Sequence, residues 1–112
     1  MTEAKKISAK YIQLAELEID PRHLDDYKIA LKEHIETAIR SEPGVLVLYA
    51  VEHEDEPARI TIFEVYRHAN AFQEHLEEPH FKKYKAVTER MVRSLKLVPA
   101  TPILLRAKES AE

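Results

Sequence analysis

The 112-residue sequence contains no cysteine, no tryptophan and a single glycine. Without cysteine the chain cannot form a disulfide framework, a thiolate nucleophile or an iron–sulfur cluster. The lone Gly44 cannot build the glycine-rich loop that holds nucleotide phosphates, so Rossmann and P-loop nucleotide sites are excluded. Any catalysis must therefore use side chains of His, Tyr, Lys, Arg, Asp or Glu.

An excess of one charge is also absent, because 17 basic residues face 20 acidic ones and the formal net charge is −3. Nucleic acid and anionic lipid attract strongly basic surfaces, so neither is an expected partner. No apolar run reaches the roughly 18 residues of a membrane span, and residues 1–6 lack the apolar stretch of a signal peptide. We expect one cytoplasmic domain over residues 1–112, with a core over 11–105 and flexible ends at 1–8 and 109–112.

Hydrophobic periodicity predicts the order strand, helix, strand, strand, helix pair, strand. The predicted elements are strand 11–19, helix 21–42, strands 45–51 and 59–66, helices 68–77 and 81–95, and strand 103–105. This order is the split βαβ pattern of a ferredoxin-like α+β fold, in which helices cover one face of an antiparallel sheet. Strands 45–51 and 60–66 are apolar on both faces, so a second copy of the sheet is the simplest cover for the other side. We therefore expect a two-fold homodimer.

Glu64 interrupts the apolar strand Ile60-Thr-Ile-Phe-Glu-Val-Tyr66. A period of two places it on the same face as Ile60, Ile62 and Tyr66. A carboxylate on a covered face must be hydrogen-bonded, paired with a charge, or used for its ionisation in a polar pocket. A salt bridge with a structural role, or exposure at the sheet edge, is the alternative interpretation.

Two histidines, His75 and His80, flank a proline and therefore lie on two helical segments that meet at one corner. His80 and Tyr84 are four residues apart and share a helix face. Two imidazoles and a phenol near Glu64 and Tyr66 would form an acid–base or substrate-orienting set, because imidazole exchanges protons near neutral pH. Alternatively, the histidines are polar residues of helix ends.

Other aromatic and imidazole side chains have more ordinary interpretations. His23, Tyr27 and His34 lie on one side of the first helix, and we interpret them as surface histidines beside an inward-facing core tyrosine. Tyr49 alternates with two valines and is predicted to be a core aromatic whose hydroxyl has a partner.

We expect no metal site, although the chain has six histidines and many carboxylates. It contains no His-Glu-x-x-His pair, and the acidic turn 52–56 lacks the spacing of a calcium loop. Pro79 is expected to disrupt the helical geometry that would bring His75 and His80 to one ion.

Several motifs along the chain form a recognisable set. They are Ile62-Phe-Glu-Val-Tyr-Arg67, Ala71-Phe-Gln-Glu-His75-Leu76, Pro79-His80-Phe-Lys-Lys-Tyr84, Glu42-Pro-Gly-Val45 and Ala15-Glu-Leu-Glu-Ile19. Together these stretches resemble the antibiotic biosynthesis monooxygenase (ABM) domain family. They extend over nearly the whole predicted core. The spacing of Glu-x-Tyr, His-Leu and Pro-His-Phe is fairly specific for the family but does not define one substrate.

The resemblance implies a dimeric α+β barrel, with a pocket between sheet and helices in each subunit. Family members with assigned chemistry oxidise quinols or polycyclic phenols with O2, and they use no metal, flavin or nicotinamide. The resemblance also implies that His75, Glu64 and Tyr66 are catalytic residues, which deprotonate or orient the substrate. The candidate substrate-binding residues are His80, Tyr84, Tyr27 and Tyr49.

Two differences between this sequence and members of the family limit which of the family's reactions we expect. The chain has no tryptophan, which argues against a bulky tricyclic substrate. The haem-degrading branch has an Asn, a Trp and a haem-ligating His, and the nearest positions of this chain are Leu17, His75 and Lys85, so haem degradation is not expected.

Two alternatives remain open. One branch of the family isomerises or degrades a phosphorylated autoinducer-2 sugar and shares the Glu-x-Tyr and Pro-His elements. Such a substrate would require Arg59, Arg67, Lys83 or a helix amino end to point into the pocket. The other alternative is a ligand-binding dimer without catalysis, which an occluded pocket would favour.

Overall fold

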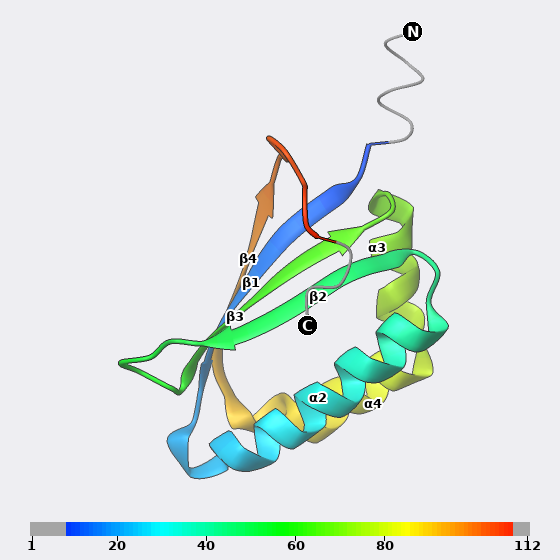
Figure 1. The fold of residues 1–112 in the computed structure, drawn as a ribbon. Coiled ribbons are helices and arrows are strands. Elements are labelled where there is room, and N and C mark those ends of the chain that lie inside the picture. The colour runs from blue at the N-terminus through cyan, green and yellow to red at the C-terminus, as the bar shows by residue number, and fades with distance from the viewer. Residues whose placement is uncertain (1–8, 109–112) are drawn as a thin grey trace, which may run out of the picture.

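The computed structural model describes residues 9–108, and it places the helices on one face of a four-stranded sheet (Figure 1). The predicted flexibility of 1–8 and 109–112 concerns residues outside this range. The elements are β1 (Tyr11–Ile19), the 3-10 turn η1 (Pro21–His23), α2 (Leu24–Ser41), β2 (Val45–Glu52), β3 (Arg59–Tyr66), α3 (Ala69–Glu77), α4 (Pro79–Thr88), the 3-10 turn η2 (Glu89–Met91) and β4 (Val92–Ala100). None of the helices in this range is long and apolar enough to span a membrane.

The sheet is antiparallel throughout, with the strand order β2-β3-β1-β4. The predicted ferredoxin-like α+β fold is confirmed, and within one chain the sheet is open. β1 and β3 occupy the centre, so their side chains lie deepest under the helices. The candidate site residues on these two strands therefore have a backbone held by hydrogen bonds to neighbouring strands on both sides.

The first helix begins where the sequence predicts. The Asp20 side chain accepts a hydrogen bond from the backbone N–H of Arg22, and Pro21 opens the short turn η1 before α2. The residues that α2 buries are Tyr27, Leu31, His34 and Ala38, at spacings of three and four. This stripe includes His34, which corrects its interpretation as a surface histidine.

The C-terminal part of the chain differs from the prediction. The helix expected over 81–95 ends at Thr88, and the last strand is β4 rather than residues 103–105. Leu95 and Leu97 alternate along β4, and such short apolar patterns fit a strand as well as a helix. Pro99 is tolerated because β4 is an edge strand, where one side of the backbone needs no hydrogen-bond partner.

Two adjoining clusters of buried side chains form the core between sheet and helices. One joins Leu17 and Ile62 of the sheet to Tyr27 of α2, and the other joins Val45 to Ala71 of α3. A Cβ atom at position 44 would lie 2.6 Å from the Cβ of Ala71, so the only glycine permits this close approach of α3.

The other face of the sheet has less cover. On edge strand β2, Tyr49 is 54% exposed and Val51 is 59% exposed. Their register opposite Phe63 and Thr61 of β3 places them on the face away from the helices. The prediction that Tyr49 is a core aromatic is therefore wrong for the single chain, because β2 is an edge strand and no helix within residues 9–108 covers that face (Figure 1).

Candidate functional site

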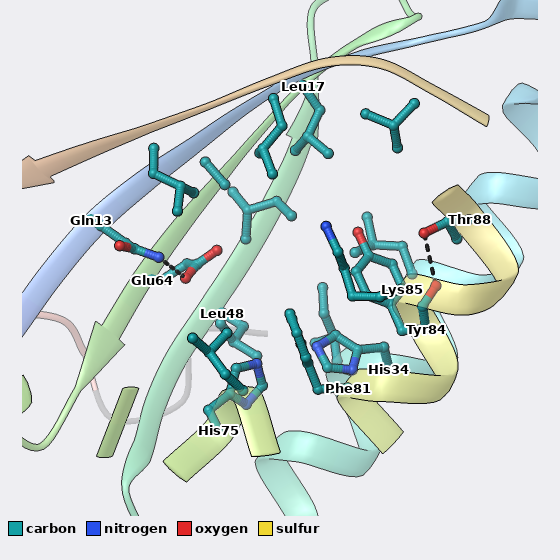
Figure 2. Close-up of a pocket in the computed structure, with 18 of the residues that line it drawn as sticks. Gln13, Leu17, His34, Leu48, Glu64, His75, Phe81, Tyr84, Lys85 and Thr88 are labelled. Atoms are coloured by element: carbon teal, nitrogen blue, oxygen red, sulfur yellow. Dashed lines mark hydrogen bonds between the residues drawn. The ribbon is translucent and has the colours of Figure 1, made fainter. Parts of the chain in front are cut away.

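A cavity of about 670 Å³ lies between the inner face of the sheet and the three helices (Figure 2). Its wall is mostly apolar, with side chains such as Leu17, Leu48 and Phe81. Its buried and half-buried polar groups include Gln13, His34, Glu64, Tyr66, His75 and Tyr84. This combination of an apolar volume with a few convergent polar groups is typical of a small-molecule site.

Glu64 is the buried carboxyl group of this cavity. As its period predicts, it shares the helix-facing side of β3 with Ile60, Ile62 and Tyr66, all of which are buried. Its Oε1 atom accepts hydrogen bonds from Gln13 Nε2 at 2.9 Å and from the Tyr66 hydroxyl at 2.8 Å. The other carboxyl oxygen has no side-chain partner among the described residues, and Figure 2 shows it turned away from Gln13.

Burial raises the pKa of Glu64 above its ordinary value, and the two donated hydrogen bonds oppose this shift only in part. Burial, followed by the charge of Glu64, likewise raises the pKa of Tyr66. Glu64 is thus a carboxyl group whose affinity for a proton is increased, with one oxygen available to a bound molecule. A group of this kind can act as a general base or acid.

His75 also lines the cavity, and it is held from behind by a residue that sequence analysis did not single out. Its Nδ1 atom lies 2.9 Å from Oε2 and 3.1 Å from Oε1 of Glu42, which follows the end of α2. A carboxylate offers only acceptors, so Nδ1 carries the hydrogen, and in the neutral form of the ring Nε2 has the free lone pair. In the sequence, the only indication of a role for Glu42 is its place in the Glu-Pro-Gly motif.

His80 binds the same carboxylate through Nε2. It does not line the cavity, so the structure places this candidate substrate-binding residue behind the wall. Glu42, His75 and His80 offer potential metal-ligating atoms that all lie within 4.8 Å of one another. The prediction that Pro79 keeps the two histidines from converging is therefore wrong, because the helix break turns both rings toward Glu42.

His34 is the second residue that sequence analysis missed. Its ring stacks on Tyr84 with centroids 4.6 Å apart and lies 5.1 Å from the ring of His75. Burial, together with nearby His75 and His80, lowers the pKa of His34 to about 4. Its Nδ1 is the one buried side-chain nitrogen or oxygen in residues 9–108 without a hydrogen-bond partner. Its position seven residues after Tyr27 was the available signal, because both belong to the buried stripe of α2.

The tyrosines predicted to bind substrate are separated by the structure. Tyr84 lines the cavity, whereas Tyr27 is fully buried and lies outside the wall. Their hydroxyls hydrogen-bond to each other, and burial raises the pKa of both. Tyr27 therefore supports Tyr84 from behind, and Tyr49 on the outer face does not reach this cavity.

The basic residues at the cavity are different from those considered in the sequence. Arg59 and Lys83 pair with surface glutamates, and Arg67 bonds to the carbonyl oxygen of Pro43. None of these three lines the cavity, whereas Lys85 and Arg93 do. Figure 2 shows the Lys85 amine extended toward the sheet across the space.

The neutral, buried His34 predicts a loss of stability in acid. Its pKa is lower in the folded state than its ordinary value of 6.5, so the unfolded chain takes up the proton first as pH falls. Because of His34, the free energy of unfolding should fall by roughly 3 kcal/mol as the pH is lowered from 6.5 to about 4. Urea unfolding across this range should show a shallower pH dependence for His34→Phe than for the wild type.

The exposed His53 provides the matched control, and His53→Gln should keep the wild-type dependence. Parallel profiles for the wild type and His34→Phe would contradict the assignment of a neutral buried imidazole.

Comparison with known proteins agrees with this architecture. The family model described as antibiotic biosynthesis monooxygenase, ABM, matches residues 10–87. A crystal structure from Bacteroides thetaiotaomicron, named as a candidate antibiotic biosynthesis monooxygenase, is 45% identical with a TM-score of 0.87, covering 89% of this chain and 97% of the other. A candidate enzyme of the same name from Nitrosomonas europaea is 20% identical with a TM-score of 0.80, covering 86% and 92%, and shows the fold alone.

A candidate monooxygenase from Lactobacillus acidophilus is 26% identical with a TM-score of 0.80, and the match covers 82% of this chain but 44% of the other. No curated protein matches the chain. The family model covers more than half of the residues, and the Bacteroides protein is similar over almost its full length. The chain belongs to the antibiotic biosynthesis monooxygenase family.

Proposed function

We propose that the protein is a monooxygenase that oxidises a quinol-like or phenolic small molecule with O2 and needs no cofactor. Family membership supports an oxidoreductase of the monooxygenase type. The observation that carries the finer proposal is the position of Glu64, whose free oxygen and raised pKa meet a mostly apolar cavity beside His75. The cavity, at about 670 Å³, is large enough for a substituted one- or two-ring aromatic compound.

The proposed chemistry begins with removal of a phenolic proton. A phenolate or enolate can give an electron to oxygen directly, provided that the protein deprotonates and orients it in a site that excludes water. Glu64 and His75 are the two groups on the wall that we assign to accept such a proton. Tyr66 holds the Glu64 carboxyl through its hydroxyl and lies beside His75, with ring centroids 5.6 Å apart.

Glu42 gives His75 the orientation that this role needs. Because Glu42 accepts the Nδ1 hydrogen, the free lone pair is on Nε2, on the side of the ring away from Glu42. The pair is buried, with side-chain exposures of 4% for His75 and 8% for Glu42. Glu42 is therefore a positioning residue in this proposal, and His75 is the group that contacts the substrate.

Oxygen uptake by chelator-treated protein tests this proposal. A panel of reduced naphthoquinols and benzoquinols should include at least one that the wild type oxidises with saturation above the uncatalysed rate. His75→Ala and Glu64→Gln should each lower the rate by about 100-fold, because loss of general acid–base catalysis typically costs this much.

His53→Asn, at an exposed position outside the cavity, should retain the wild-type rate. No uptake with any quinol would contradict the proposed oxygenase chemistry. Uptake that survives His75→Ala would contradict the role of His75.

We also propose that two chains associate through the outer sheet face to form a homodimer. The exposed Tyr49 and Val51 extend an apolar surface that includes the partly buried Val47 and Phe63. Contiguous apolar patches of this kind commonly mark an interface. Sedimentation equilibrium should give twice the chain mass of 13.0 kDa, and Tyr49→Lys should shift the equilibrium toward the single chain. A wild-type protein that sediments as one chain would contradict the proposed dimer.

A second candidate function is isomerisation of a phosphorylated carbonyl compound, and one observation favours it. Lys85 extends into the cavity without an ion pair among the described residues, and Arg93 also lines the wall. A cation at this place suits an anionic substituent of the substrate. The third possibility is a ligand-binding dimer without catalysis, which an occluded pocket would favour. It has less support because the cavity has space for a ligand.

Lys85→Met and Lys83→Met separate an anionic substrate from a neutral one. Lys85→Met should weaken calorimetric binding of a phosphorylated hydroxyketone by about tenfold, the usual effect of losing a charge-assisted hydrogen bond. Lys83→Met is a matched control, because Lys83 pairs with Glu33 at the surface. Equal binding by both variants would exclude phosphate recognition by Lys85.

A further inference from the structure

Three side chains with metal-ligating atoms meet behind the cavity wall. Glu42 follows the end of α2, His75 lies in the last turn of α3 and His80 lies in the first turn of α4. These three helix ends come together at one side of the sheet (Figure 1). The side-chain exposures are 8% for Glu42, 4% for His75 and 16% for His80. The cluster is therefore largely shielded from solvent, with His80 as its most accessible member.

We propose that Glu42, His75 and His80 form a binding site for one divalent transition-metal ion of the zinc type. Their candidate ligand atoms are a Glu42 carboxylate oxygen, His75 Nδ1 and His80 Nε2, and all of them lie within 4.8 Å of one another. Two imidazoles and one carboxylate are a common ligand set for zinc and for non-haem iron. Three protein ligands leave at least one coordination position for water.

The spacing is close to that of a metal site. Ligand atoms on a tetrahedral zinc ion lie roughly 3.3 Å apart, because each bond to the metal is about 2.0 to 2.1 Å long. His75 Nδ1 is already 2.9 Å from Glu42 Oε2, and His80 Nε2 contacts the same oxygen. Side-chain rotations that open these two contacts would admit the ion.

The chemistry of the donors also indicates which ions fit. Calcium and magnesium prefer sets of oxygen ligands, and this cluster offers two nitrogens and a single carboxylate. Imidazole nitrogen instead favours zinc, copper, nickel and cobalt. The ion would take the place of the hydrogens that both imidazoles now direct at Glu42, and its positive charge would be matched in part by the carboxylate.

Metal binding at this place changes what His75 offers to the cavity. With an ion on Nδ1, a neutral imidazole carries its hydrogen on Nε2, so His75 becomes a hydrogen-bond donor there and loses its free lone pair. Zinc should therefore suppress any reaction that uses His75 as a base. This consequence rests on the proposed function, whereas the metal site itself does not.

The test uses the full-length protein after chelator treatment, with zinc chloride followed by calorimetry and cobalt chloride followed by visible absorption. The wild type should bind one zinc ion per chain and should show the absorption bands of tetrahedral or five-coordinate cobalt. Glu42→Gln and His80→Asn should each weaken zinc binding by about 100-fold, since each removes a ligand. His53→Asn, at an exposed position, should bind as the wild type does.

The outcomes separate the metal site from its proposed effect on His75. Absence of a cobalt spectrum in the wild type, or equal loss of zinc affinity in His53→Asn and His80→Asn, would overturn the metal site. His80→Asn keeps the test valid if the more buried Glu42→Gln fails to fold. Zinc binding by a protein without oxygen uptake would uphold the site and contradict the proposed function. Oxygen uptake that persists at saturating zinc would overturn the coupling to His75.

Discussion

The contacts of the Glu42 carboxylate underlie most of the arrangement at the site. This one side chain joins the end of α2 to His75 of α3 and His80 of α4. A buried carboxylate needs hydrogen-bond donors, and here the two imidazoles supply them. The need to satisfy one buried charge therefore sets the ring orientation of His75, and it brings three helix ends to one corner of the cavity.

On the opposite wall the same requirement is met differently. Glu64 on central strand β3 receives hydrogen bonds from a neighbouring strand, through Gln13, and from its own strand, through Tyr66. Both donors go to one oxygen, and burial still raises the pKa of the group. Glu64 is thus hydrogen-bonded to side chains through one carboxyl oxygen only. A buried carboxyl group with a raised pKa is typical of functional sites. Glu64 lines the cavity directly, Glu42 lies behind His75 of the wall, and His34 and Tyr84 stack along the helical side.

Much of the architecture follows from local patterns. The order of elements, the inward direction of Tyr27 and the shared face of Glu64 and Tyr66 are all predicted by periods of 3.6 and two. Local periodicity does not decide the structure of β4, because Leu95 and Leu97 fit either period over a short distance. His34 was misread for a related reason. A histidine in a helical stripe is compatible with a surface or a core position until the partner that packs on it is known.

The sequence by itself determined the fold class, the face of each central strand and the family, because these depend on local periodicity and on motifs close together in the chain. Only the tertiary structure decided the association of Glu42 with His75 and His80, which lie 33 and 38 residues away. It also placed Tyr49 outside the cavity and Lys85 at its wall. Contacts between distant segments depend on how whole elements pack, and periodicity specifies which face is buried but not which residue will lie opposite.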